Sequence, residues 1–335
     1  MHTNRLQNPT AAVVVTHNRI DLLRQCVAQL ENQTCACDIL IVDNASTDGT
    51  AQWLASQPDL HWRNTGANLG GAGGFNLGMR WAVEAGYDYV WVMDDGEKIG
   101  AASDPEANLW LNPQSWAVIS GLATDDQRET ILQNVYDRLN TAFGAILMDP
   151  PYHAHAFDGA LAVIYNPGTK ENSGIFSQSQ GWLILAEALC GHGGRAFGYF
   201  MENAPAAQND RAEIRHLEPY CYGQFTEGKA SPHFGRSHVH WLTGTASTVM
   251  VGCVEGILGL RPDFGGLRLA PSIPASWDGF EMEKRFRGKK LHIQVRNPWH
   301  IESGCRKLTL NGQELPDNYL PEELLKEENE IVLTL

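Results

Sequence analysis

The apolar pattern of this chain changes twice along its length, and no single layer architecture accommodates all three patterns. Over residues 1–96, short β-branched runs alternate with helical spacing; over 97–264, helical spacing dominates; over 265–335, short alternating segments are separated by Gly and Pro turns. A chain of 335 residues has room for two or three domains. We therefore predict a multidomain protein with boundaries at these two changes of pattern.

The first segment has the alternation of an open α/β sheet. Three β-branched or aromatic runs predict strands, at Ala11–Thr16, Asp38–Asp43 and Tyr87–Met93. Helices are expected between them, at Ile20–Leu30, after the capping residues Ser46–Gly49, and from the glycine-rich Gly66–Gly78 to Ala85. Ligands of such sheets lie at the carboxyl ends of the strands.

Polar residues stand where these strands end: Thr16, Asn18 and Arg19 after the first, Asp43 after the second, and Asp94 with Asp95 after the third. An aspartate at a strand end can accept hydrogen bonds from a base or a ribose. Paired aspartates can hold a divalent ion that bridges a diphosphate. Any one of these aspartates taken alone is explained equally well as a helix cap.

Four sequences in this segment, VVVTHNR, IVDNASTDGT, NLGGAGGFNLG and VWVMDD, are similar to family 2 glycosyltransferases of the galactofuranosyl or rhamnosyl type. The resemblance implies a partial GT-A, Rossmann-like domain that binds a UDP- or dTDP-sugar. It places Thr16, Asn18, Arg19 and Asp43 in the nucleotide pocket, and Asp94 and Asp95 on Mg²⁺ or Mn²⁺. Gly96 stands where that family often has a third aspartate, and no acceptor-binding half follows.

The most polar stretch of the second segment is YNPGTKENSGIFSQSQGW, Tyr165–Trp182. Pro167-Gly168 and Ser173-Gly174 are turn signals, so Lys170 and Glu171 are expected on a loop. The residues from Gly181 onward have the spacing of a buried helix. A polar loop held on a helix is a usual place for binding sugar hydroxyls and anions. A single Lys-Glu pair on a turn would otherwise be a solvated ion pair.

Further helices are expected at Asn112–Ala123, Glu129–Phe143, Ala196–Ala204 and Thr245–Leu258. Beyond Gly265, the segments LRLAPSIP, FEMEKRFRGKKLHIQVRNP, CRKLTLNGQEL and EIVLTL predict a small antiparallel sheet, with Asn311-Gly312 as a hairpin turn.

The polar stretch, together with NPQSWAVIS, NDRAEIRHLEPY and WLTGTAS, closely resembles the family 94 glycoside phosphorylases from about Glu97 onward. The resemblance implies a partial (α/α)6 barrel followed by a C-terminal antiparallel β-sandwich. It places Tyr165, Lys170 and Glu171 on the acceptor sugar, and Thr243 and Gly244 on phosphate. Gln178 stands where the family has a phosphate-binding histidine, and because an amide carries no charge, we expect weaker phosphate binding.

The activity implied by this resemblance is inverting phosphorolysis of a β-linked disaccharide such as cellobiose, with phosphate as a substrate and no cofactor. The family's general acid lies in an ADWND-like motif upstream of NPQSW, and the sequence has no such motif. We therefore expect impaired catalysis, with the catalytic residue unknown. Two alternatives stay open: a nucleotide-sugar-dependent family 2 glycosyltransferase, and a catalytically incomplete fusion that only binds sugar or nucleotide.

The composition of the chain limits which partners it is expected to bind and in which cellular compartment it is expected to lie. A formal charge of −14 disfavours nucleic acid and anionic membranes. No apolar run approaches the roughly 20 residues of a membrane span, and the seven scattered cysteines fit reduced thiols. The twelve histidines lack the spacing of an HExxH metal site. We expect a cytoplasmic protein that binds small sugars and phosphate and, as is common in the phosphorylase family, forms a homodimer.

Overall fold

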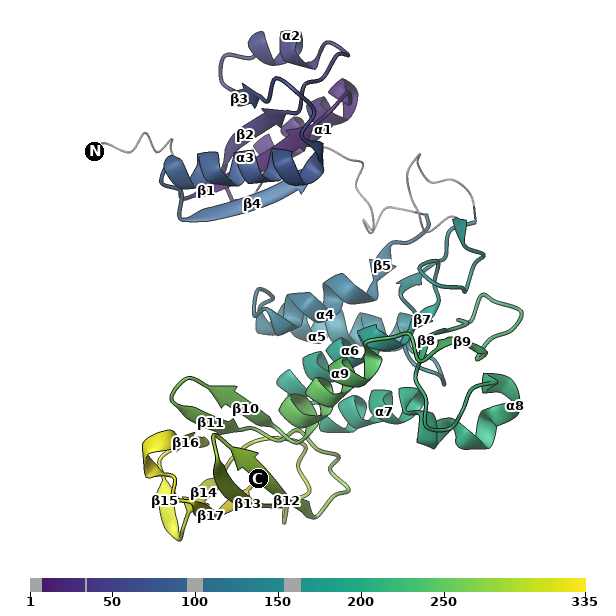
Figure 1. Cartoon of the computed structure of the whole chain (residues 1–335), viewed down its shortest axis with the longest axis vertical. Helices are drawn as coiled ribbons and strands as arrows, with labels where there is room; N and C mark the ends of the chain where they lie inside the picture. Colours follow the sequence, from purple (N-terminus) through teal and green to yellow (C-terminus); the bar gives the residue numbers. More distant parts are fainter. Residues whose placement is uncertain (1–7, 34, 95–104, 154–163) are drawn as a thin grey trace. The chain divides into compact units, whose positions relative to one another are not determined.

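The computed structural model describes residues 8–33, 35–94, 105–153 and 164–335. The chain forms two compact units, 1–98 and 99–335, each with buried apolar clusters of its own (Figure 1). The predicted division into several domains of different type is thereby confirmed in outline. The finer boundaries at 96 and 264 stay predictions.

The first unit is built on a parallel sheet of four strands, in the order β3-β2-β1-β4. The strands are β1 (Thr10–Thr16), β2 (Asp38–Asp43), β3 (His61–Asn64) and β4 (Tyr89–Asp94). The predicted open α/β sheet is confirmed. The edge strand β3, with the sequence HWRN, was not predicted, because it has no apolar run and is mostly exposed.

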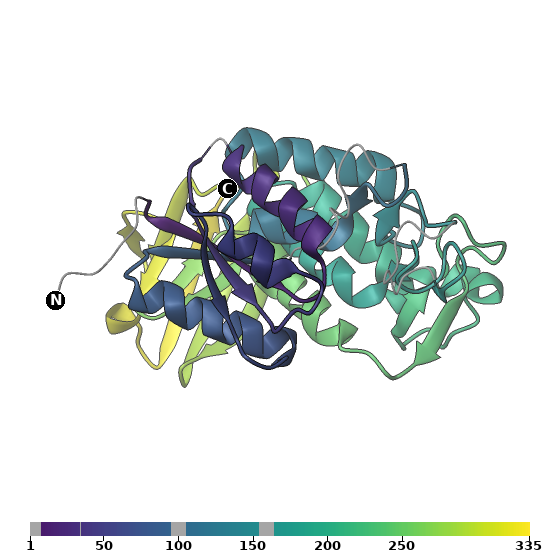
Figure 2. The same ribbon diagram turned by 90° about the horizontal axis from the view of Figure 1, so that it is seen from above.

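Helices cover both faces of this sheet: α1 (Ile20–Glu31), α2 (Thr50–Ala55) and α3 (Gly70–Glu84). Successive residues of a strand point to opposite faces. Ala12 and Val14 of β1 accordingly pack in a cluster with Leu23 of α1, whereas Ala11 and Val13 pack in another with Ala82 of α3. Figure 2 shows the purple α1 and the blue α3 on opposite sides of the strands.

The glycine-rich sequence that precedes β4 is a packing surface on α3. An added Cβ at Gly74 would lie 2.6 Å from Val15 Cγ1, and one at Gly78 would lie 2.3 Å from Val13 Cγ1. The valines are buried in the sheet. The glycines therefore let the helix backbone approach β1 more closely than any side chain would allow.

We predict that Gly78→Ala destabilises the first unit by about 2 kcal/mol, because the methyl group overpacks a dense core. Gly71 of the same helix is the matched control, since an added Cβ there meets no atom within 4 Å. Gly71→Ala should be neutral or stabilising by up to about 1 kcal/mol. Hydrogen exchange of the β1 amides reports the stability, and equal protection in both variants would contradict this account.

The helices of the second unit are arranged around α6 (Ser177–Leu189), which packs against α4 (Leu111–Ile119), α7 (Gly193–Asn203) and α9 (Thr245–Val251). The others are α5 (Asp125–Asn134) and α8 (Ala212–Arg215), with π-helical turns η1 (Val135–Leu139) and η4 (Gly252–Ile257) and the 3₁₀ segment η3 (Pro205–Arg211). A capping box of Thr124 and Gln127 begins α5.

Helix α6 begins at Ser177, four residues before the predicted start at Gly181. The first turn has the polar sequence SQSQ, so it lacks the apolar spacing from which the rest of the helix was predicted. Its Gln180 is nevertheless fully buried, with Oε1 accepting from Ala145 N at 2.8 Å and Nε2 donating to the carbonyls of Ala145 and Phe176. The earlier start places Gln178 on the first turn of the helix.

Two sheets follow the helices. One is antiparallel, β10-β11-β16: β10 (Leu260–Asp263), β11 (Gly266–Leu269) and β16 (Tyr319–Pro321). The other has the order β12-β13-β17-β14-β15: β12 (Gly279–Phe286), β13 (Lys289–Arg296), β14 (Lys307–Leu310), β15 (Gln313–Leu315) and β17 (Glu328–Thr334). The 3₁₀ turn η5 (Glu322–Leu324) precedes β17.

The predicted antiparallel sheet was wrong at one pairing, because β17 pairs in parallel with β13, although it pairs antiparallel with β14. Alternation along a strand fixes which side chains are buried but not the direction of the neighbouring strand. The Asn311-Gly312 hairpin between β14 and β15 is confirmed, with φ of 50° and 83° at the two turn residues, as the common two-residue turn requires.

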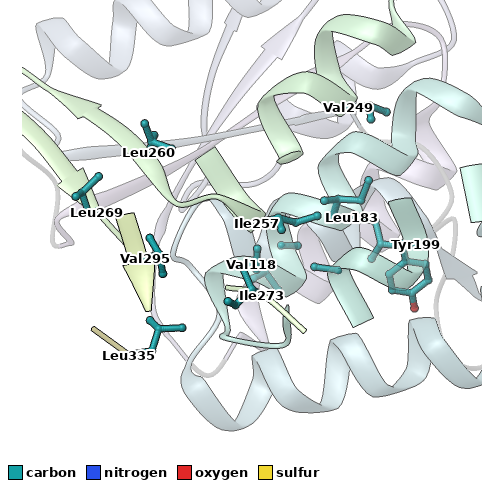
Figure 3. Close-up of a cluster of buried hydrophobic side chains, with 14 of the residues drawn as sticks. Val118, Leu183, Tyr199, Val249, Ile257, Leu260, Leu269, Ile273, Val295 and Leu335 are labelled. Atoms are coloured by element: carbon teal, nitrogen blue, oxygen red, sulfur yellow. The ribbon is translucent and has the colours of Figure 1, made fainter. Parts of the chain in front are cut away.

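The helices and sheets of the second unit share one buried core (Figure 3). Val118 of α4, Leu183 of α6 and Val249 of α9 belong to the same cluster as Leu269 of β11 and the final residue, Leu335. The strand-rich end is therefore joined to the helices by apolar packing as well as by the chain. In the part of the chain that the structure describes, no helix is both long and apolar enough to span a membrane.

Candidate phosphate and sugar site

The residues predicted to bind phosphate come together where α6 and α9 begin. Gln178 lies on the first turn of α6, and Gly244 is the residue immediately before α9. An added Cβ at Gly244 would lie 3.8 Å from Gln178 Cδ. The Thr248 hydroxyl of α9 also donates to the Gln178 carbonyl at 2.9 Å. Positions far apart in sequence thus form one small surface.

This meeting depends on a close crossing of the two helices. An added Cβ at Gly181 would lie 2.3 Å from the Thr248 carbonyl carbon, and one at Gly252 would lie 2.7 Å from the Gly181 carbonyl oxygen. Backbone therefore touches backbone where α6 meets α9 and η4. A side chain at either glycine would push the helices apart and separate Gln178 from Gly244.

Thr243 and Gly244 offer donors at this surface. Thr243 is half-buried and Gly244 is exposed. The Thr243 hydroxyl lies 2.6 Å from the Thr245 hydroxyl and accepts from Thr245 N at 3.2 Å. The first amides of a helix such as α6 lack intrahelical acceptors and carry positive partial charge. The arrangement has the chemistry of an oxyanion site.

The residues predicted to bind sugar lie on a tight turn that leads into α6. Asn172 N donates to the Thr169 carbonyl at 3.0 Å, and Lys170 adopts φ of 46° between them. Lys170 Nζ donates to Gln224 Oε1 at 3.0 Å and lies 5.8 Å from the centroid of the Tyr165 ring. The predicted loop is confirmed. The structure brings Tyr165 and Lys170 together and leaves Glu171 exposed.

A three-stranded sheet supports this turn: β7 (Ile175–Phe176), β8 (Gly223–Thr226) and β9 (Ser237–His240). Strand β7 joins the turn directly to α6 (Figure 1). Phe176 of β7 pairs with Phe225 of β8, and this register places Gln224 beside Lys170. Sequence reasoning missed Gln224, because GQFT contains no recognisable motif. A shorter two-stranded pair, β5 (Leu109–Trp110) and β6 (Met148–Asp149), lies elsewhere in the unit.

A buried carboxylate, Glu227, organises the connection between β8 and β9. It is 3% exposed. Its Oε1 accepts from His238 Nε2 at 2.7 Å and from Arg236 Nε at 2.8 Å, and its Oε2 accepts a hydrogen bond from the Ser231 hydroxyl. The sequence alone did not identify Glu227 as the anchor of this connection.

Burial raises the pKa of the Glu227 carboxyl, but the hydrogen bonds from Ser231, His238 and Arg236 outweigh burial and hold the pKa below its ordinary value. A carboxyl with a lowered pKa stabilises the fold while it is ionised. That stabilisation is complete above the pKa of the unfolded chain and is lost as the pH falls through the folded value.

We predict that Glu227→Gln lowers the free energy of unfolding at pH 7 by about 3 kcal/mol, because Arg236 and His238 lose a buried anion. The difference from the unmodified protein should shrink as the pH falls below the ordinary glutamate pKa, since the carboxyl then becomes protonated. Denaturant unfolding at pH 7, 5, 4 and 3 measures it. The control is Glu213→Gln, at an exposed position, and a pH-independent difference at Glu227 would contradict the ionic account.

The polar residues predicted in the first unit converge at one edge of its sheet. Thr16 pairs with Asp43 in the β1–β2 register, and Val15 pairs with Asp94 in the β1–β4 register. The strand order changes direction between β1 and β4, which is where ligands of open α/β sheets bind. Asp95 lies outside the described residues, and the structure describes only the backbone of Asp94.

Asp43 is fully buried, and both of its carboxylate oxygens are engaged by the chain. Oδ1 accepts from Ser46 N at 2.9 Å, and Oδ2 accepts from Asn64 Nδ2 at 2.7 Å. Asn18, at φ of 55°, accepts from Thr47 N at 2.6 Å through its side chain, whereas Arg19 is exposed. The Asp43 and Asn18 side chains therefore hold together the loops that follow β1 and β2 and the end of β3. Within the described ranges, no cluster of three or more His, Cys, Asp or Glu side chains is arranged to hold a metal.

Comparison with known proteins identifies both parts of the chain. Residues 79–259, more than half of the 335, match the family described as the glycosyl hydrolase 94 superfamily, catalytic domain. The chain belongs to this superfamily. Residues 260–298 match the C-terminal domain of glycosyl hydrolase family 65, and residues 11–96 match glycosyl transferase family 2. The two resemblances inferred from sequence motifs are confirmed.

The relatives fall into the same two groups. An N,N'-diacetylchitobiose phosphorylase of Vibrio proteolyticus is 34% identical over 255 residues, which cover 76% of this chain and 32% of the relative. The cyclic β-(1,2)-glucan synthase NdvB of Rhizobium meliloti is 29% identical over 207 residues, 60% of this chain and 7% of the relative. The galactofuranosyltransferase GlfT1 of Mycobacterium tuberculosis is 43% identical over 88 residues, 25% of this chain and 29% of the relative.

The chain spans about a third of the length of the phosphorylase relatives that it matches. The family 94 match begins at residue 79, within α3, and overlaps the end of the glycosyltransferase match at residue 96. Residues 79–94 fold with the first unit, since α3 packs on its sheet and β4 pairs with β1. The described part of the overlap, residues 79–94, therefore belongs to the first unit.

Proposed function

We propose that the second unit provides the phosphate- and sugar-binding half of a glycoside phosphorylase site, for inverting phosphorolysis of a β-linked disaccharide such as cellobiose. The supporting observation is the meeting of Gln178 with Thr243-Gly244 where α6 and α9 begin. Phosphate is a substrate in this reaction, and no cofactor is required. In this reaction, a phosphate oxygen attacks the anomeric carbon while a carboxylic acid protonates the leaving oxygen.

Each side chain has a role in this proposal. The Thr243 hydroxyl, the Gly244 amide and the Gln178 amide donate to phosphate oxygens. Lys170, Tyr165 and Glu171 hold the acceptor sugar, whose hydroxyls both donate and accept hydrogen bonds. The short strand β7 keeps Lys170 and Gln178 on one continuous segment, to which the start of α9 adds Thr243 and Gly244.

The general acid is the missing part. The sequence has no ADWND-like motif, and losing a general acid costs on the order of 10²–10⁴ in rate. We therefore propose that the chain by itself binds its substrates and is impaired in catalysis.

The proposal includes the finer architecture expected from the family: half of an (α/α)6 barrel, a C-terminal β-sandwich, a partial GT-A domain and a cytoplasmic homodimer. Exposed apolar side chains on the helices, such as Trp116 at 46% and Met250 at 67%, support a covering partner.

We predict that Thr243→Ala weakens phosphate binding about 10- to 100-fold, because a hydrogen bond to a charged group is lost. Gln178→His should tighten binding by about 5-fold at pH 6 and by less at pH 8, since the imidazolium adds a charge only below its pKa. Calorimetric titration with phosphate in the presence of glucose measures both. Thr130→Ala on α5 is the control, and phosphate binding unaffected by Thr243→Ala would reject this placement of the site.

A second candidate function belongs to the first unit. Thr16, Asp43 and Asp94 share one edge of a parallel sheet at its change of strand order. We propose that this edge binds a UDP- or dTDP-sugar, with Thr16, Asn18 and Arg19 near the nucleotide and Asp43 holding the loops around it. Asp94 and Asp95 would hold Mg²⁺ or Mn²⁺, which neutralises a diphosphate. Transfer to an acceptor would need the acceptor-binding half that the sequence lacks.

We predict that the full chain binds UDP in the presence of Mn²⁺ and that Asp94→Asn abolishes the metal dependence, because a carboxylate ligand is replaced by a neutral amide. Asp43→Asn should weaken UDP binding only through the loops that Asp43 braces. Asp59→Asn, at an exposed position, is the control. If neither UDP nor phosphate binds, both parts of the chain are related to these enzymes by descent alone.

A further inference from the structure

A series of side-chain contacts connects Lys170 to the buried carboxylate of Glu227. The Lys170 ammonium lies 5.6 Å from the centroid of the Phe225 ring. Phe225 stacks on the His238 ring with centroids 4.9 Å apart and planes 14° from parallel. The imidazole is in turn held by Glu227 Oε1 at 2.7 Å. The orientation of His238 therefore depends on a carboxylate that lies outside the predicted substrate site.

A second set of contacts joins Glu227 to the same turn. Ser231, which donates to Glu227 Oε2, packs against Gly168 so closely that an added Cβ there would lie 2.3 Å from Ser231 N. Gly228 N also donates to the Gly168 carbonyl at 2.7 Å. The Pro167-Gly168 turn that precedes Lys170 thus rests on the loop that Glu227 organises.

We propose that Glu227 is a positioning residue for sugar binding. Its buried carboxylate fixes the positions of the His238 and Ser231 side chains. These side chains in turn determine the positions of Lys170 and Tyr165. The proposal rests on the proposed role of Lys170 and Tyr165 in holding the acceptor sugar. Nothing in the family resemblance or in the sequence motifs assigned a function to this residue.

The carboxylate form is essential to this role. Donors from three side chains, those of Ser231, Arg236 and His238, converge on its two oxygens. A glutamine has a single acceptor oxygen and would turn an NH₂ group toward one of these donors. Glu227→Gln should therefore release either the Ser231 side or the His238 side of the loop while preserving the volume of the side chain.

The first test reports the placement of Lys170 without any ligand. Lysines of the full chain are reductively methylated with ¹³C-formaldehyde, and the Lys170 signal is assigned from Lys170→Arg. We expect this signal to be displaced by the Tyr165 and Phe225 rings, and to move toward the position of exposed lysines in Glu227→Gln and in His238→Ala. Glu213→Gln is the control. A signal unchanged in Glu227→Gln, in protein shown to be folded by circular dichroism, would overturn the proposal.

The second test separates positioning from general stability. In calorimetric titrations, Glu227→Gln should weaken glucose binding about 10-fold, and combining it with Lys170→Ala should add nothing to Lys170→Ala alone, because both changes act through one group. Phosphate affinity should stay unchanged. Equal losses of glucose and phosphate affinity would show a structural role only. If the unmodified protein binds no glucose, the proposed function fails, and the Lys170 signal still decides whether Glu227 positions this side chain.

Discussion

The second unit depends on the glycine contact between α6 and α9–η4. Gly181 and Gly252 let the two helical segments touch through their backbones, and such contacts leave no room for adjustment because protein interiors are close-packed. The contact fixes the distance between Gln178 and Gly244 more rigidly than side-chain packing would. The oxyanion site proposed at these two helix ends needs this fixed distance, since its donors must converge on one small group.

The turn proposed to bind sugar is built in a different way. Its turn is short and polar, with Lys170 in a left-handed conformation, and it gains its order from neighbours. The β7–β8 pairing places Gln224, the Phe225–His238 stack supports Lys170, and the Glu227 carboxylate holds the loop behind them. A buried anion is stable there because donors from Ser231, Arg236 and His238 replace water. Rigid helices thus carry the residues proposed to bind phosphate, and a hydrogen-bonded loop carries those proposed to bind sugar.

The chain joins parts of two carbohydrate-active families. Its first unit is a small parallel sheet with interlocked loops at one edge, and its second unit is a helical and strand-rich body of the glycosyl hydrolase 94 superfamily. The two parts bury separate apolar clusters. Each part is coherent in its packing, and the whole chain spans about a third of the length of the phosphorylase relatives that it matches.

The sequence by itself determined the parallel strands, most helices, the Lys170 turn and the Asn311-Gly312 hairpin, because these depend on local periodicity and turn chemistry. It also indicated both families from short motifs. Only the tertiary structure decided the parallel pairing of β13 with β17, the early start of α6 and the buried, hydrogen-bonded position of Glu227. Strand direction, the burial of Gln180 and the convergence of donors on Glu227 depend on residues distant in the chain, and no local pattern encodes such contacts.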